Sequence, residues 1–298
     1  MGDQLDDFRN LDAAGRAAAV AAQRPRAAVY AVLGTAVALS WAALLAMAVR
    51  VADARAPGLS APGDAVLRAL PDLPWPGWFD TLIALCLSPQ PLGGGIWARL
   101  AVLSVMWLLM SVAMMLPSAA PMIRTYCEIA DTARAKHEAV VHPLVLVGGY
   151  LAVWLAVSAG FATLTLAIQA VASAADPLAP VRGIVAAAVL AIAGLYQFSG
   201  LKAACLRKCR NPFSILFGRW STRPSRIFRL GMQQGAWCVG CCWALMLVMF
   251  AVGLMNILWM AVIGIFTLFE KQMAGSLPSR VAGAILLVWA GALLLSAV

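Results

Sequence analysis

Three cysteines lie within five consecutive residues of this chain, at Cys238, Cys241 and Cys242. On a helix, side chains three and four residues apart share one face, with their Cβ atoms about 5–6 Å apart. Cys205 and Cys209 repeat the four-residue spacing in the most basic part of the chain. Thiolate sulfur binds soft metal ions such as Cu(I), and paired cysteines can also exchange electrons. The spacing therefore predicts that these five cysteines form a thiophilic metal site or a redox relay.

A second set of sulfur atoms follows a helical period. Met106, Met110 and Met114 recur every four residues and drift by only about 80° around a helix axis, whereas Met115 points to the opposite side. Thioether sulfur also prefers Cu(I), so this stripe predicts a second, weaker metal site inside the protein. Methionine is also a common core filler and cysteine a small buried hydrophobe. Core packing is therefore the alternative interpretation for both sets.

Motifs for other kinds of chemistry are missing from the sequence. The chain has two histidines, His137 and His142, which we expect to be solvated loop residues. Two are too few for a haem or di-iron site of the multi-histidine kind, or for a copper oxidase centre. There is no phosphate-binding loop, no dinucleotide-binding glycine motif and no His-Glu-x-x-His motif. We assign no catalytic residue, and the sequence leans against an enzyme.

The composition indicates that the elements holding these residues lie in a membrane. Apolar residues make up 63% of the chain and charged residues 12%, which excludes an ordinary soluble domain. A span needs about twenty apolar residues to cross roughly 30 Å of hydrocarbon. Apolar runs of about this length or longer occupy residues 27–49, 98–116, 144–171, 183–200, 235–269 and 281–298. We therefore predict an all-α, polytopic transmembrane helix bundle with six or seven spans.

The run at 235–269 decides between six spans and seven. Its thirty-five residues would form a helix about 52 Å long, which is too long for one upright span and short for two. Gly253 and Asn256 offer the break, and we favour two spans hinged near Gly253. In the second run, Pro117 and Pro121 should break or kink the helix at its end. We expect a loop to follow at 118–142.

Basic residues orient the bundle. The segment 201–232 has eight lysines and arginines and no acid, so the positive-inside rule predicts that this loop and the N-terminus are cytoplasmic, in a bacterial inner membrane. We divide the chain into a cytoplasmic lead-in at 1–26 and a single transmembrane domain at 27–298. That domain includes a proline- and tryptophan-rich external loop at about 50–97. Anionic lipid headgroups account for the net charge of +9, and no nucleic-acid partner is expected.

Three polar side chains interrupt the apolar runs, at Gln197, Asn256 and Glu270. Polar groups within a membrane tend to face the interior of the bundle or a cavity. Glu270 precedes Lys271 at the end of its run, and we expect this pair to snorkel to the interface. A site that couples proton or ion movement is the alternative.

Many of these residues belong to short motifs that follow one another along the chain in an order typical of a known family. The positions are Met106-Trp107-x-x-Met110-x-x-x-Met114-Met115-x-Pro117-x-x-x-Pro121-Met122, Lys202-x-x-Cys205-Leu206-x-x-Cys209-Arg210-x-Pro212, Cys238-x-Gly240-Cys241-Cys242-Trp243-x-Leu245-Met246, Met255-Asn256 and Glu270-Lys271. With them the chain resembles a bacterial family of predicted metal-binding integral membrane proteins, over roughly residues 106–271. The resemblance implies a polytopic membrane fold and metal binding, but no particular reaction.

Three classes of function agree with the sequence. The favoured one is a membrane protein that handles or transports a soft metal, with copper(I) first and zinc second. Its predicted ligands are Cys205, Cys209, Cys238, Cys241 and Cys242 at the cytoplasmic side, with Met106, Met110 and Met114 as the weaker inner site. The alternatives are a thiol-redox membrane enzyme and a non-catalytic subunit or assembly factor of a larger complex. The expected partners are the lipid bilayer and either other membrane subunits or a metallochaperone.

Overall fold

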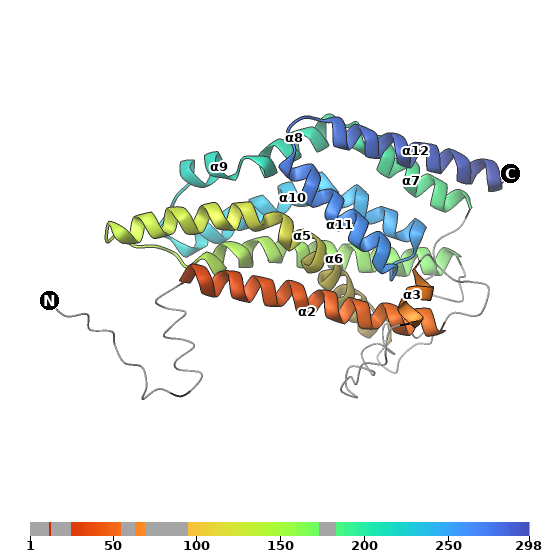
Figure 1. The fold of residues 1–298 in the computed structure, drawn as a ribbon, viewed down its shortest axis with the longest axis horizontal. Helices are drawn as coiled ribbons and strands as arrows, with labels where there is room; N and C mark the ends of the chain where they lie inside the picture. Colours follow the sequence, from red (N-terminus) through yellow and green to blue (C-terminus); the bar gives the residue numbers. More distant parts are fainter. Residues whose placement is uncertain (1–11, 13–24, 55–62, 70–94, 173–182, 298) are drawn as a thin grey trace.

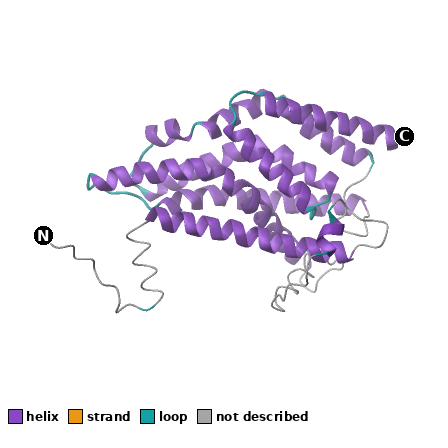
Figure 2. Ribbon diagram, viewed as in Figure 1, coloured by secondary structure: helices purple, strands orange, loops and turns teal. Residues whose placement is uncertain are grey.

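The computed structural model describes residues 12, 25–54, 63–69, 95–172 and 183–297. Within these residues the regular elements are helices and there is no strand, which confirms the all-α prediction (Figure 2). The helices are α2 (Pro25–Ala54), α3 (Asp64–Arg68), α5 (Gly95–Ala135), α6 (Pro143–Ala172), α7 (Ile184–Gln197), α8 (Gly200–Arg210), α9 (Pro212–Gly218), α10 (Pro224–Val252), α11 (Ile257–Gln272) and α12 (Leu277–Ala297). Cys86 and most of the predicted lead-in and external loop lie outside the described residues.

Five of these helices are long and apolar enough to cross a membrane: α2, α5, α6, α10 and α12. Helices α7 and α8 pass the same test together, but they meet at an angle of 62°, as a broken span or a re-entrant loop would. The described part of the chain therefore has five candidate spans, or six with the bent pair. The fold is a polytopic helical bundle, as predicted, and it matches the lower expected count of six when the bent pair is counted as one span. The run at 235–269 supplies one candidate span, α10, and not the two that we favoured.

Helix α10 is central to the packing of the bundle. It contacts α6, α7, α8 and α11, while α5 contacts α2, α6 and α11. Helices α7 and α12 pack against each other along one side of the bundle, and α2 lies along the opposite side (Figure 1). This arrangement places α8, α10 and α11, which come from separate parts of the sequence, around a common interior.

The predicted break at Gly253 and Asn256 is confirmed. Gly253 ends α10 with a φ of 101°, a left-handed value that favours glycine. The side chain of Asn256 then caps α11 by accepting a hydrogen bond from the backbone N–H of Trp259. Helix α11 doubles back beside α10, so Lys271 at its end contacts Cys238 near the middle of α10. With 16 residues, α11 is about 24 Å long, which explains why it falls short of the length of a full span.

Helix α5 corrects the loop that we predicted at 118–142. The helix continues through Pro117 and Pro121 as far as Ala135, and only a short connection precedes α6. Pro117 has no N–H to donate to the carbonyl of Ala113. The indole Nε1 of Trp41 on α2 donates to that carbonyl over 3.1 Å instead. The bundle therefore satisfies the group that the proline leaves free, and the helix is not ended there.

The basic segment at 201–232 is also more ordered than predicted. It contains α8, α9 and the first turns of α10 in place of a continuous loop. Ser199 begins α8 as an N-cap whose side chain accepts a hydrogen bond from the backbone N–H of Lys202. This cap follows the bend after α7, and it turns Cys205 and Cys209 back toward α10.

Glycines bring α6 and α10 into close contact. A Cβ atom on Gly231 of α10 would lie 2.0 Å from the carbonyl oxygen of Leu146, and one on Gly149 of α6 would lie 2.0 Å from that of Phe228. Neither position has space for a larger residue, because the obstacle in each case is backbone. Small residues at such contacts are the usual means by which membrane helices approach closely.

We expect Gly231→Ala to destabilise the protein by about 1–3 kcal/mol, because α6 and α10 would have to move apart. The matched control is Gly160→Ala on α6, where an added Cβ would have no heavy atom within 4 Å. Thermal unfolding of both variants in detergent measures the difference. Equal unfolding midpoints for the two variants would show that the close contact does not limit stability.

Candidate metal centre

The sulfur atoms of Cys238, Cys241 and Cys242 lie together inside the bundle. They come within 4.8 Å of one another, and each residue is no more than 2% exposed. The spacing of three and four residues on α10 produces this grouping directly, as the sequence predicted. A soft metal ion could bind between them, because thiolates are the ligands that such ions prefer.

The two cysteines of α8 approach this cluster from the side. The Sγ of Cys209 lies 4.0 Å from the Sγ of Cys241. Cys205 packs against Gly240, where an added Cβ would come 2.5 Å from its Sγ. Cys205 is buried, whereas Cys209 is only partly buried. The contact between α8 and α10 therefore gathers all five predicted cysteine ligands in one region and leaves Cys209 as the most accessible of them.

Polar groups from α6 and α11 contact the sulfur of Cys238, and a hydroxyl of α5 contacts the second of these groups. The Sγ of Cys238 lies 3.1 Å from the hydroxyl of Tyr150 on α6. It also accepts a hydrogen bond of 3.0 Å from the Nζ of Lys271 on α11. The same ammonium donates to the hydroxyl of Ser118 on α5 over 2.6 Å. The thiols of Cys241 and Cys242 donate to the carbonyl of Cys238, at 3.0 and 2.8 Å. The thiol of Cys238 is thus the most polar position in the cluster.

A buried ion pair lies next to the cluster. The Nζ of Lys202 on α8 is 2.8 and 3.0 Å from the two carboxylate oxygens of Glu270 on α11, and both side chains are 1% exposed. Ser279 on α12 donates to Glu270 over 2.6 Å, and the ammonium of Lys202 also donates to Gln197 on α7. The guanidinium of Arg210 holds the backbone carbonyl of Glu270. This network ties four helices together where the cysteines meet.

The ion pair corrects our expectation that Glu270 and Lys271 snorkel to the interface. Glu270 points into the protein and pairs with Lys202, which the sequence placed in the basic segment and in a family motif without indicating a partner. Lys271 points to the sulfur cluster. The expectation fails because α8, α11 and α12 meet around these charges and cover them. A local sequence pattern cannot reveal this contact, because Lys202 and Glu270 are 68 positions apart.

The remaining sulfur and histidine residues lie elsewhere. Met106, Met110 and Met114 are buried in the apolar core along α5, and Met114 packs beside Gly264 of α11. The metal site that we predicted along this stripe stays a prediction. Cys127 is buried on α5. His137 and His142 are exposed beyond the end of that helix, as expected.

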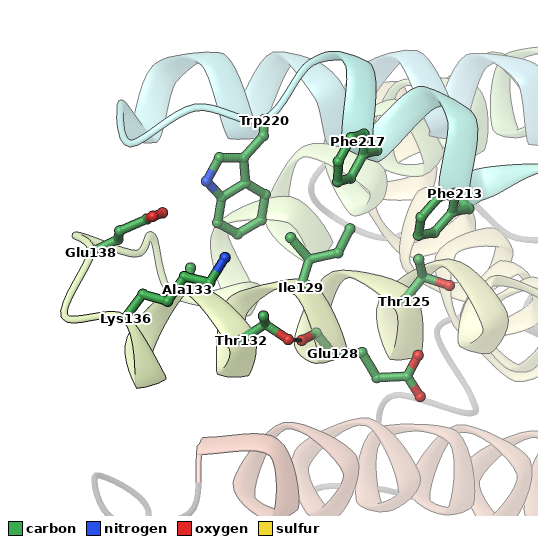
Figure 3. Close-up of a pocket in the computed structure, with 10 residues that line it drawn as sticks. All are labelled: Thr125, Glu128, Ile129, Thr132, Ala133, Lys136, Glu138, Phe213, Phe217 and Trp220. Carbon is green, nitrogen blue, oxygen red and sulfur yellow. Dashed lines mark hydrogen bonds between the residues drawn. The ribbon is translucent and has the colours of Figure 1, made fainter.

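Two cavities open at the end of the bundle where α5 ends and α10 begins. One has a volume of about 450 Å³ and lies between the last turns of α5 and the side chains of Phe213, Phe217 and Trp220 (Figure 3). The other, of about 420 Å³, is lined by Arg219, Arg226 and Arg229 among others. Neither is lined by a predicted ligand, and Cys205, Cys238, Cys241 and Cys242 belong to the packed hydrophobic core.

Comparison with known families decides the identity of the chain. Residues 104–293 match a family described as PpoB2, copper chaperone. The chain belongs to this family. The matched residues include all eight predicted ligands and Lys271. Comparisons with curated proteins and with solved structures found no match. Family membership agrees with the resemblance to metal-binding proteins, and the buried cysteine cluster is a group of residues that could hold a metal ion.

The sequence did not predict the polar groups around the cysteine cluster. Tyr150 and Ser118 look like ordinary helix residues in the sequence, and their contacts depend on how α5, α6 and α10 pack. Only Lys271 carried a signal in the sequence, because it is a charged residue at the end of a long apolar run. Its partner could not be predicted without the reversal of the chain at Gly253.

Proposed function

We propose that this protein binds copper(I) as cargo through Cys238, Cys241 and Cys242, with Cys209 as a fourth thiol at the access side. The observation that carries the proposal is the grouping of three buried thiols within 4.8 Å in a member of a copper chaperone family. Two or three thiolates suit Cu(I), whereas Zn(II) usually takes four ligands in a tetrahedron. Zinc is therefore the second choice, with Cys209 or Cys205 as the fourth ligand.

The difference in burial supports a direction of copper movement. Cys209 is partly exposed and its sulfur is 4.0 Å from that of Cys241, whereas the three thiols of α10 are almost completely buried. Copper arriving on Cys209 would exchange that ligand for Cys241 and then reach the buried cluster. Exchange among neighbouring thiolates avoids releasing the ion into the apolar interior, where an unliganded charge would be very costly.

The protein would also move copper into the membrane. The candidate spans support a membrane protein, and the basic segment supports a cytoplasmic position for the start of α10, whose middle turns bear the cysteines. Copper would then pass between the cytoplasmic side of a bacterial inner membrane and the methionines of α5. A ladder of weak, closely spaced sites allows an ion to leave as well as to enter.

Elemental analysis of the detergent-purified protein, with free-thiol counting, tests the proposal. About one copper per chain, with the thiols unreactive until copper is removed, is the expected result. Stoichiometric zinc in place of copper would overturn the choice of metal. A disulfide between Cys209 and Cys241 without any metal would favour the thiol-redox alternative, which their 4.0 Å separation also permits. The absence of both metal and disulfide would favour the subunit interpretation.

The role of Cys209 as the receiving thiol gives a kinetic prediction. Cys209→Ser should slow copper uptake several-fold, because the remaining thiols are buried, while most of the copper bound at equilibrium is retained. Transfer of Cu(I) from a coloured chelate, followed by absorbance, measures the rate. Cys127→Ser is the control, since Cys127 lies on α5 outside the cluster. An unchanged rate in Cys209→Ser would place the access route elsewhere.

A further inference from the structure

The ammonium of Lys271 is unusually placed, because it points at sulfur. It donates hydrogen bonds to the Sγ of Cys238 over 3.0 Å and to the hydroxyl of Ser118 over 2.6 Å. Lys271 is mostly screened from solvent at the junction of α5, α10 and α11. A lysine removed from water needs an anion nearby, or the cost of desolvating its charge is not recovered.

Among the residues that the structure describes, no carboxylate forms an ion pair with Lys271. Among the described residues after Pro143, Glu270 is the only aspartate or glutamate. Its two oxygens are occupied by Lys202 and Ser279, and both Glu270 and Lys202 are 1% exposed. The charges of Lys202 and Glu270 therefore cancel each other. The positive charge of Lys271, which lies directly beside the cysteine cluster, is not neutralised by this pair.

We propose that the ammonium of Lys271 stabilises bound copper by offsetting the negative charge of the copper(I)–thiolate group. This inference rests on the proposed copper site. One Cu(I) with two thiolates carries a net charge of −1, and with three thiolates −2. A neighbouring ammonium brings these totals to zero and −1. Lowering the net negative charge of the site by one should strengthen copper binding, because charges interact much more strongly in a buried site than in water.

The surrounding contacts hold Lys271 in place for this role. Glu270, the preceding residue, is fixed by the ion pair to α8 and by Ser279 on α12. Its backbone carbonyl is fixed by Arg210, which follows Cys209 on α8. The same helix that presents Cys209 to Cys241 thus also sets the position of the ammonium against Cys238. The bundle positions the positive charge together with the thiols, independently of any bound ion.

A charge series tests the proposal. Lys271→Arg, Lys271→Gln and Lys271→Glu would be compared with the wild type for Cu(I) affinity, by competition with a coloured Cu(I) chelator in detergent. We expect Lys271→Gln to raise the Kd by about 10- to 100-fold, the range typical of residues that support metal ligands. Lys271→Glu should raise it further, and Lys271→Arg should stay nearest to the wild type. Lys208→Gln is the control, because it removes the same charge from an exposed position on α8.

The outcomes separate this inference from the proposed function. A wild type that binds no Cu(I) would refute the copper site itself. A wild type that binds Cu(I) with an affinity equal to that of Lys271→Gln would overturn the role of Lys271 alone. Equal losses in the Gln and Glu variants would also overturn it, because they would indicate a steric effect. Thermal unfolding without copper identifies any variant that is merely misfolded. Lys271→Gln keeps a donor for Ser118, and we expect it to unfold close to Lys208→Gln.

Discussion

Cys241→Ser is expected to abolish stoichiometric copper binding, with a loss of affinity of at least about a hundredfold. Cys241 is the cysteine that joins the two parts of the site, because it shares the cluster with Cys238 and Cys242 and its sulfur faces that of Cys209. A serine hydroxyl is a poor ligand for a soft ion, whereas thiolate is a strong one. Removing a ligand should therefore cost more than removing a group that supports a ligand, which costs about 10- to 100-fold.

Serine is a suitable replacement because it changes the donor atom and little else. Its hydroxyl can donate to the carbonyl of Cys238, as the thiol of Cys241 does over 3.0 Å. The variant should therefore fold, and circular dichroism should show the same helix content as the wild type. Cys127→Ser, also a buried cysteine on a long helix, should keep its copper. Copper analysis of the three proteins after identical loading and desalting is the measurement. A Cys241→Ser protein that retains one copper per chain would refute this ligand assignment.

The local parts of the site could be predicted from the sequence, and the long-range parts could not. The grouping of Cys238, Cys241 and Cys242 follows from helical spacing alone. The turn that brings α11 back follows from Gly253 and Asn256, a glycine at the end of one apolar run and a capping residue at the start of the next. These are local signals, and the structure follows them.

The features that the sequence did not predict share a physical cause. In each case a neighbouring helix provides the hydrogen-bond donor or the counter-charge that the local sequence does not contain. Pro117 does not end α5, because Trp41 from another helix satisfies the carbonyl it leaves free. The basic segment forms helices although its charges indicated only which side of a membrane it occupies. Lys202 and Glu270 are both buried because each is the partner of the other. A pair separated by 68 positions leaves no pattern that a single sequence can show.

The ion pair between Lys202 and Glu270 also helps to hold the cysteines of α8 and α10 close together. Cysteine side chains are short, so four of them can converge only if α8 and α10 are held in a fixed register. The network around Glu270 joins α7, α8, α11 and α12 on the side of the cluster where α8 crosses α10. Breaking it should loosen α8 and move Cys209 away from Cys241. Loss of the ion pair alone should therefore lower both stability and copper retention.

Lys202→Met is accordingly expected to destabilise the protein by about 3–5 kcal/mol, because it leaves the carboxylate of Glu270 buried without its counter-charge. The double variant Lys202→Met/Glu270→Leu should recover much of this loss, since replacing both members of a buried pair with apolar residues is often close to neutral. Lys208→Met is the control for removing a lysine from an exposed position of the same helix. Denaturant unfolding in mixed micelles, followed by circular dichroism, compares the four proteins.

The double variant decides between a role in stability and a role in the copper site. If the pair only stabilises the bundle, the double variant should regain both stability and copper affinity. If the pair also sets the position of Lys271 and of α8, the double variant should regain stability but still bind copper more weakly than the wild type. We expect the second result, because Glu270 adjoins the lysine that contacts Cys238. A Lys202→Met protein as stable as Lys208→Met would show that Glu270 finds another partner or is neutral in the folded protein.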